Sequence, residues 1–308
     1  MNLIICYTPL QVLIAKKIMA LYPNETFFGV MLCSVQSKKF DYYGKELEKC
    51  CEQFFTMHQH TDRFNLLKEI AYLRLKFLGK KFDKVFVASI NDMQIQFILS
   101  SSKFNEFYTF DDGTANIVDN SVYYTDEPNT AIRKLINTLF MNKYSVRKLK
   151  ALSKAHYTIY PNFANIIENT IPINLIESNS TQQLESDDAT NILLGQPIYL
   201  EQEKNIALAK DVIKRFNIQL YLPHPREQYK LDGVTYVDTP LIFEDYIAQS
   251  FANKKCRVYT YFSSAILNVL NNPNIEVVAL RIDTDKQAFI NCYQLFDKLG
   301  VNVVDVRK

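Results

Sequence analysis

The sequence predicts an α/β protein with two domains, each built on a parallel sheet that has helices on both faces. Short apolar runs rich in β-formers alternate with segments of helical spacing, which is typical of parallel sheets. This alternation stops once, in a polar stretch near the middle of the chain, and then resumes. The chain has 308 residues, a length that suits two domains of ordinary size better than one core.

The first half begins with the apolar run NLIICY (2–7). Thr8 and Pro9 form a turn before a helical pattern over 10–22. A second helical pattern, over 66–79, is closed by Gly79. Further strands are predicted at 26–34, 83–90, 107–110 and 156–161, and a further helix directly after Asn91 and Asp92.

Residues 171–188 lose periodicity and gain Ser, Asn, Gln and acidic residues, which indicates a linker. The expected domains are therefore 1–170 and 189–308. The second domain is predicted to contain strand-and-turn segments at 191–197, 218–225 and 256–264, strands at 234–239, 275–282 and 301–306, and helices at 201–216, from Phe243 and at 265–271.

Composition and charge exclude several classes of protein. Hydrophobic residues make up 48% and charged residues 22%, which is typical of a folded chain and not of a disordered one. The net charge of +2 gives no reason to expect nucleic-acid binding. The N-terminal apolar run lacks a basic start and is broken at Thr8 and Pro9, so it predicts neither a signal peptide nor a membrane span.

Cysteine and histidine spacing predicts a reduced, cytoplasmic protein without a metal site. No CxxC occurs, and the adjacent Cys50 and Cys51 do not fit a secreted disulfide scaffold. His58 and His60 lie in a polar loop, where we expect them to be solvated rather than to bind a metal. The seven glycines form neither GxGxxG nor a Walker A sequence.

The stretch TFDDGTANI (109–117) places two carboxylates where a strand ends. Asp-Gly is a strong turn signal, so Asp111 and Asp112 have a purely structural interpretation as turn residues. However, ligands of open parallel sheets bind beyond the carboxyl ends of the strands, and most other strand ends in this chain are also polar. The pattern alone leaves both interpretations open.

The second half has its own polar strand ends. His224 lies between two prolines that restrict its backbone, and Arg226 adds a fixed positive charge suited to an anion. Ser263 and Ser264 precede a predicted helix, where hydroxyls and N–H groups can bind phosphate or simply cap the helix. Glu244 starts another helix and could accept bonds from ribose hydroxyls or merely favour the first turn.

These motifs, in this order, resemble the bacterial CMP-sialic acid sialyltransferases, above all the lipooligosaccharide sialyltransferases of glycosyltransferase family 52. The motifs are FDDG (110–113), PHPR (223–226), FED (243–245) and YFSS (261–264). The opening NLIICYTPLQVLIAKKIM (2–19) is also similar to the first strand and helix of that family.

The resemblance implies a GT-B-type fold, in which two Rossmann-like domains with parallel sheets face a central cleft. It further implies an inverting transfer of sialic acid from CMP-sialic acid, without a cofactor or metal, to a galactose-terminated glycolipid or oligosaccharide. An α-2,3 linkage is expected. A GT-B enzyme with another nucleotide-sugar donor, or a non-catalytic nucleotide- or sugar-binding protein, remains an alternative.

The resemblance also assigns roles to residues. An acid of the FDDG motif, Asp112 or else Asp111, would be the general base, and we expect Asp112 because it is nearest the turn. His224 would assist departure of CMP. The donor-binding set is Gly195, Gln196, Pro197, His224, Pro225, Arg226, Glu244, Phe262, Ser263 and Ser264. The acceptor-binding set is Thr8, Pro9, Gln11, Asn91 and Gly113.

Glu201 is a rival base. Some members of the family carry an acid soon after the LLG-x-P turn, and in this chain the corresponding stretch is LLGQPIYLEQEK. It has no Asp at the turn, so Glu201 is the nearest acid after it. Glutamate is common in first helical turns, which makes an exposed helix acid the plainer interpretation of Glu201.

The segment 133–154 has seven basic residues, no acidic ones and apolar residues at helical spacing. It is either a solvated helix face or a contact to anionic lipid on the inner face of the membrane. A homodimer is left open by the sequence.

Overall fold

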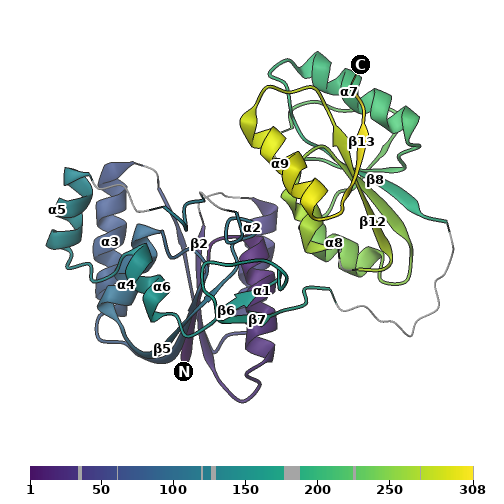
Figure 1. Ribbon diagram of the computed structural model, residues 1–308. Helices are drawn as coiled ribbons and strands as arrows, with labels where there is room; N and C mark the ends of the chain where they lie inside the picture. Colours follow the sequence, from purple (N-terminus) through teal and green to yellow (C-terminus); the bar gives the residue numbers. More distant parts are fainter. Residues whose placement is uncertain are drawn as a thin grey trace. The chain divides into compact units, whose positions relative to one another are not determined.

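The computed structural model of the chain describes residues 1–33, 37–60, 62–118, 121–125, 130–176, 188–224, 227–270 and 272–307. The chain divides into two compact units, Met1–Leu175 and Ile176–Lys308 (Figure 1). Every strand pairing within the described sheets is parallel. The predicted α/β class with two parallel sheets is therefore confirmed.

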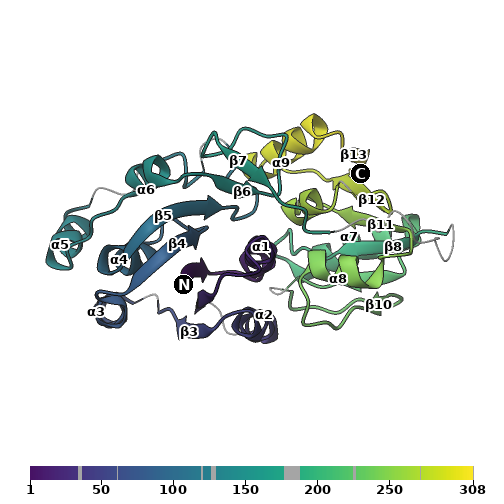
Figure 2. The ribbon, with the colours of Figure 1, turned by 90° about the horizontal axis from the view of Figure 1, so that it is seen from below.

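The first unit has a seven-stranded sheet of order β3-β2-β1-β4-β5-β6-β7. Its strands are β1 (Asn2–Cys6), β2 (Phe27–Cys33), β3 (Gln53–His58), β4 (Lys81–Val87), β5 (Lys103–Phe110), β6 (His156–Thr158) and β7 (Thr170–Pro172). Its helices are α1 (Pro9–Ala20), α2 (Lys38–Lys49), α3 (Arg63–Phe77), α4 (Met93–Ser101), α5 (Ala131–Leu139) and α6 (Val146–Leu152). Figure 2 shows α1 and α2 on one face of this sheet and α3, α4 and α6 on the other.

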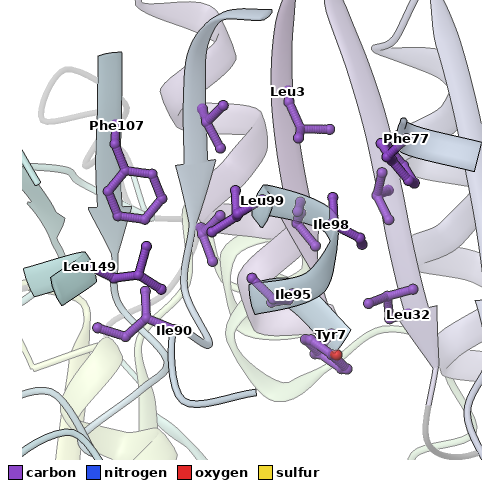
Figure 3. Close-up of a cluster of buried hydrophobic side chains, with 14 of the residues drawn as sticks. Leu3, Tyr7, Leu32, Phe77, Ile90, Ile95, Ile98, Leu99, Phe107 and Leu149 are labelled. Carbon is purple, nitrogen blue, oxygen red and sulfur yellow. The ribbon is translucent and has the colours of Figure 1, made fainter. Parts of the chain in front are cut away.

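The core of the first unit explains why its central strands are continuous apolar runs. Both β1 and β2 are buried at every position, because helices cover both faces of the sheet. On one face, Leu3 of β1 and Phe107 of β5 pack in one cluster with Ile98, Phe77 and Leu149 of three helices (Figure 3). This packing fixes the strand ends that carry the polar residues.

Local signals set where the helices begin. The Thr8 side chain caps α1 by accepting a hydrogen bond from the Gln11 amide, and Pro9 occupies the first helical position. Asp92 caps α4 in the same way, through the amide of Ile95 at 3.1 Å. The turn predicted at Thr8 and Pro9, and the polar pair Asn91 and Asp92, therefore lie at helix starts, where Thr8 and Asp92 are the N-caps.

The second unit has a six-stranded sheet of order β10-β9-β8-β11-β12-β13. Its strands are β8 (Thr190–Leu194), β9 (Leu220–Leu222), β10 (Thr235–Tyr236), β11 (Cys256–Thr260), β12 (Ile275–Arg281) and β13 (Asn302–Asp305). Its helices are α7 (Gln202–Arg215), α8 (Phe243–Ser250), the 3-10 helix η1 (Ser264–Asn268) and α9 (Gln287–Lys298).

Several features differ from the sequence prediction or add to it. Helix α2, strand β3 and helix α9 lie in segments for which no element is predicted. The basic segment 133–154 forms two helices instead of one, and β7, at the start of the predicted linker 171–188, joins the first sheet. The predicted helix at 265–271 is only a short 3-10 helix, Ser264–Asn268.

Within the described ranges, no helix has both the length and the apolar character needed to cross a bilayer.

Candidate active site

Several polar residues of each unit lie at or next to the point where the order of the strands reverses. In the first sheet this switch point lies between β1 and β4, and in the second between β8 and β11. Loops leave the two strands in opposite directions there, and in folds of this class ligands bind at that point. The two switch points are described in turn.

Asp112 follows β5 and is partly exposed. Its Oδ1 accepts a hydrogen bond of 2.6 Å from Nε2 of Gln11, and its Oδ2 accepts one of 2.7 Å from the hydroxyl of Tyr123. Its own amide donates to Oδ1 of Asn116 at 2.6 Å, which closes the loop after the acidic pair. Gly113 supports the turn with a φ of +65°, a conformation that favours glycine.

Gln11 is fully buried and connects the ends of three strands. Its Nε2 also donates to the hydroxyl of Ser89, after β4, at 3.0 Å. Its Oε1 accepts from the main-chain amide of Tyr7 at 2.7 Å. Gln11, predicted to bind the acceptor, makes these contacts to the protein itself, and its acceptor-binding role stays a prediction.

Asp111 is fully buried, unlike its neighbour. Its carboxylate accepts hydrogen bonds of 2.7 Å from Nε2 of His156, from the Thr158 hydroxyl and from the Ile159 amide, and one of 3.2 Å from Asn165. These partners lie on β6 and the segment after it. The carboxylate is thus satisfied within the protein, and it holds the end of β6 against β5.

The other predicted acceptor residues lie near the same edge of the sheet. Thr8 and Pro9 form the start of α1, and Asn91 is partly exposed between β4 and α4. Asp92, next to Asn91, keeps some exposure, but desolvation still raises the pKa of its carboxyl group.

In the second unit, Gln196 spans the switch point. Its Oε1 accepts hydrogen bonds from the Thr260 hydroxyl at 3.0 Å and from the amides of Tyr261 and Phe262 at 3.2 and 3.1 Å. The predicted donor-binding residue Gln196 therefore joins the end of β8 to the loop after β11. Pro197, next to it, is partly exposed.

Gly195 precedes Gln196 and lies against Tyr221 of β9 and Glu227 of the loop after β9. A Cβ at this position would collide with the hydroxyl of Tyr221 and the carboxylate of Glu227. The Tyr221 hydroxyl donates to Glu227 at 2.6 Å, and burial raises the pKa of the Glu227 carboxyl group. Only glycine fits here without displacing that pair.

Glu244 and the serine turn belong to one structural group. Glu244 is buried at the start of α8 and accepts a hydrogen bond of 2.6 Å from Nδ2 of Asn268, at the end of η1. Ser263 precedes η1, and its amide donates to the Thr260 hydroxyl at 3.1 Å. Ser264 is the first residue of η1.

His224 and Phe262 lie in loops after β9 and β11. His224 is partly exposed, and its carbonyl accepts a hydrogen bond from the Glu227 amide at 2.9 Å. Phe262 stacks on Phe289 with 3.7 Å between ring centroids, so Phe289 covers one of its two faces. The predicted residues Pro225 and Arg226 lie outside the described residues.

Glu201 is a surface residue. Its side chain is 57% exposed and forms an ion pair of 3.0 Å with Lys204. The hydrogen bond from Lys204 lowers the pKa of the Glu201 carboxyl group. These features agree with the plainer interpretation from sequence, an exposed helix acid.

Comparison with known proteins identifies the family. The model of glycosyltransferase family 52 matches residues 24–284. The chain belongs to glycosyltransferase family 52. It is 60% identical over 309 residues to "CMP-N-acetylneuraminate:beta-galactoside alpha-2,3-sialyltransferase" of Pasteurella multocida (strain Pm70), with 100% of both chains covered. It is also 42% identical to "N-acetyllactosaminide alpha-2,3-sialyltransferase" of Haemophilus influenzae, over 98% of this chain and 99% of that one. The family resemblance expected from the four motifs is confirmed.

Solved structures support the fold of this family 52 chain. The structure of Arabidopsis thaliana UGT89C1 complexed with quercetin covers 99% of this chain and 85% of its own, with a TM-score of 0.57 at 14% identity. The glycotransferase of kitacinnamycin covers 99% of this chain and 86% of its own, with a TM-score of 0.51 at 8% identity. The predicted GT-B type, two Rossmann-like domains in one chain, is confirmed.

The family 52 site contains two groups that the sequence did not reveal. Tyr123 lies in a segment without periodicity, and only the folded loop brings its hydroxyl to Asp112. Ser89 lies near the end of the strand predicted at 83–90, and nothing in the sequence indicated that its hydroxyl accepts a hydrogen bond from Gln11. Within the described ranges, no three His, Cys, Asp or Glu side chains are grouped so that they could hold a metal ion.

We expect Asp111→Ala to destabilise this family 52 protein by about 3–5 kcal/mol, because it leaves buried donors on His156, Thr158 and Ile159 without their acceptor. The partly exposed Asp112 is the matched position, and Asp112→Ala should cost less stability, because water can reach the donors that it leaves. Thermal and denaturant unfolding of both variants measure the difference. Equal midpoints for the two variants would contradict the anchoring role of Asp111.

Proposed function

We propose that this family 52 protein is an inverting sialyltransferase. It moves N-acetylneuraminic acid from CMP-sialic acid to a terminal β-galactoside, forms an α-2,3 linkage and acts on lipooligosaccharide or a related glycan. The observation that carries this proposal is the 60% identity, over the whole chain, to a relative named for that reaction. The local geometry of both switch points supports it, because each offers groups that the transfer needs.

Asp112 is the proposed general base. The acceptor hydroxyl must lose its proton as it attacks the anomeric carbon, and a positioned carboxylate can accept that proton. Asp112 is partly exposed at the switch point, whereas Asp111 is sealed inside the unit by four hydrogen bonds. Attack from the face opposite the leaving CMP inverts the anomeric centre.

Groups of the second unit are proposed to stabilise the leaving nucleotide. Negative charge grows on the CMP phosphate as the bond breaks, and preorganised donors lower the energy of that state. His224 supplies a proton or a hydrogen bond, and Ser263 and Ser264 supply hydroxyls at the turn fixed by Gln196. Glu244 would bind the cytidine ribose. We therefore propose that no metal is required, since these donors perform the task that a metal ion performs elsewhere.

Mass spectrometry of the product formed from CMP-sialic acid and lactose tests the proposal. We expect a sialylated product in the presence of EDTA, and linkage analysis should give α-2,3. Asp112→Asn and His224→Ala should each lower kcat by about 10²–10⁴-fold, because each removes a group that transfers a proton in the transition state. Glu201→Gln should retain activity.

Each contrary result has a distinct meaning. No product and no CMP release above the acceptor-free blank would overturn the transferase proposal. Loss of activity in Glu201→Gln, with activity kept in Asp112→Asn, would transfer the role of base to Glu201. Stronger thermal stabilisation by UDP or GDP than by CMP would assign another donor class, since stabilisation follows ligand concentration over dissociation constant.

We further propose that α5 contacts the anionic inner face of the cytoplasmic membrane, where a glycolipid acceptor would lie. Ile132, Leu135, Leu139 and Met141, here called the α5 face, are all more than half exposed. Phe140 anchors the helix end by packing on Phe97 of α4, with 5.8 Å between centroids. Both ribbon views place α5 at the outer edge of the helices that cover this side of the sheet (Figure 1 and Figure 2).

The charge around the α5 face favours lipid as its partner. Lys134, Lys143, Arg147 and Lys148 are exposed, and residues 130–154 contain no acid. Basic residues near an anionic bilayer contribute about 1 kcal/mol each, and exposed apolar side chains insert at the headgroup boundary. Apolar groups flanked by exposed basic residues are therefore suited to an anionic surface.

The double variant Leu135→Ser/Leu139→Ser should lose most of its binding to vesicles of phosphatidylglycerol and phosphatidylethanolamine in a sedimentation assay. Leu21→Ser is the matched control, since Leu21 is also more than half exposed and lies at the end of α1, away from the basic segment. Wild-type binding should weaken as salt rises. If the wild type ignores the vesicles and the double variant converts a dimer to a monomer in light scattering, the α5 face is instead a subunit interface.

A further inference from the structure

Both oxygens of the Asp112 carboxylate are bound by side chains of the protein. Gln11 donates to one oxygen at 2.6 Å and Tyr123 to the other at 2.7 Å. One donor comes from α1 and the other from the loop between β5 and α5. Two donors on different oxygens fix the plane of a carboxylate, because rotation about its last bond would break both hydrogen bonds.

The carboxamide of Gln11 cannot flip so that Nε2 and Oε1 exchange places. Its Oε1 accepts from the Tyr7 amide at 2.7 Å, so flipping the carboxamide would place the NH₂ group against an N–H donor. Its Nε2 is further held by the Ser89 hydroxyl at 3.0 Å. The side chain is 0% exposed, which leaves no room for another rotamer. Gln11 therefore presents its N–H to Asp112 in one fixed direction.

Tyr123 is held as firmly. Its ring is 1% exposed and belongs to the buried cluster that includes Val87 and Leu149. Its carbonyl accepts a hydrogen bond from Lys150 at 3.1 Å, which holds the loop. Burial, and then the charge of Asp112, raise the pKa of the Tyr123 phenol, so the hydroxyl keeps its proton and remains a donor.

The Asp112 carboxylate is partly exposed, so its charge does not need two buried donors in order to be solvated. Water can solvate Asp112, whereas the carboxylate of Asp111 needs protein donors because it is sealed from solvent. Orientation, in contrast, is what a general base requires, since the rate depends on how the accepting lone pair meets the proton. The remaining lone pairs of Asp112 are the ones that an acceptor hydroxyl would meet.

We propose that Gln11 and Tyr123 are positioning residues that fix the carboxylate of Asp112 for proton abstraction from the acceptor hydroxyl. This inference rests on the proposed function, in which Asp112 is the general base. Gln11 joins that base to β1 and β4, and Tyr123 joins it to the helical side of the first unit. The base is thereby held both by Gln11, which joins the strand ends, and by the buried ring of Tyr123.

The test compares Tyr123→Phe with Tyr108→Phe in steady-state transfer from CMP-sialic acid to lactose. Each variant removes one phenol-to-carboxylate hydrogen bond of 2.7 Å on the first unit, to Asp112 in one case and to Glu106 of β5 in the other. We expect Tyr123→Phe to lower kcat about tenfold with the KM for CMP-sialic acid unchanged. Tyr108→Phe should keep wild-type kcat.

Two further variants test whether the effect acts through Asp112. Gln11→Glu keeps the acceptor for the Tyr7 amide but replaces the other donor, and it should lower kcat by more than tenfold. In the Asp112→Asn background, Tyr123→Phe should change the residual rate by less than twofold, because there is no longer a base to position.

Failure of this inference differs from failure of the proposed function. An inactive wild type would overturn the function, and the positioning role with it. An active wild type whose Tyr123→Phe variant keeps full kcat would overturn the positioning role alone. So would a Tyr123→Phe variant that lowers kcat, donor binding and Tm together, because such a pattern reports loss of structure.

Discussion

The structure depends on how each sheet is held together at its switch point. Main-chain hydrogen bonds join β1 to β4, and β8 to β11, only as far as the strands themselves extend. After the last paired residues the loops leave in opposite directions. A side chain has to span the gap. In both units it is a glutamine, Gln11 in the first and Gln196 in the second. Gln11 lies in the first turn of α1, and Gln196 follows the end of β8. Each glutamine therefore links the ends of two neighbouring strands.

The two glutamines use opposite ends of the carboxamide. Gln11 directs its N–H at Ser89 and Asp112, so the first switch point collects acceptors and ends on a carboxylate. Gln196 directs its carbonyl oxygen at donors of the loop after β11, so the second collects donors and fixes the turn that leads to Ser263. An acceptor-rich edge suits removal of a proton, and a donor-rich edge suits a phosphate. The chemical difference between the units thus follows from which end of one amide is used.

Sequence patterns predicted the parts of this arrangement that are local. Apolar runs and helical spacing located most strands and helices, and they showed which polar residues follow the strands. Contacts distant in sequence were not predictable. Tyr123 reaches Asp112 from an irregular loop, and the sequence placed Gln11 among the acceptor-binding residues without indicating its hydrogen bond to Asp112. The helical pattern at 265–271 predicted a helix there, but not that it is a short 3-10 helix.

Asp111 and Asp112 are adjacent at the end of β5 but lie in different environments, one buried and one partly exposed. Alternation along β5 predicts that only one of Asp111 and Asp112 points in a given direction, but not which one meets solvent. The neighbouring strand decides, because β6 brings His156 and the amide after Thr158 to Asp111 and so supplies its charge with buried partners. Asp112 is then the carboxylate left at the open edge. The buried acid keeps β6 in place, and β6 completes the edge on which the second acid lies. Loss of Asp111 would therefore act on Asp112 through the structure, whereas loss of Asp112 would remove the exposed carboxylate itself.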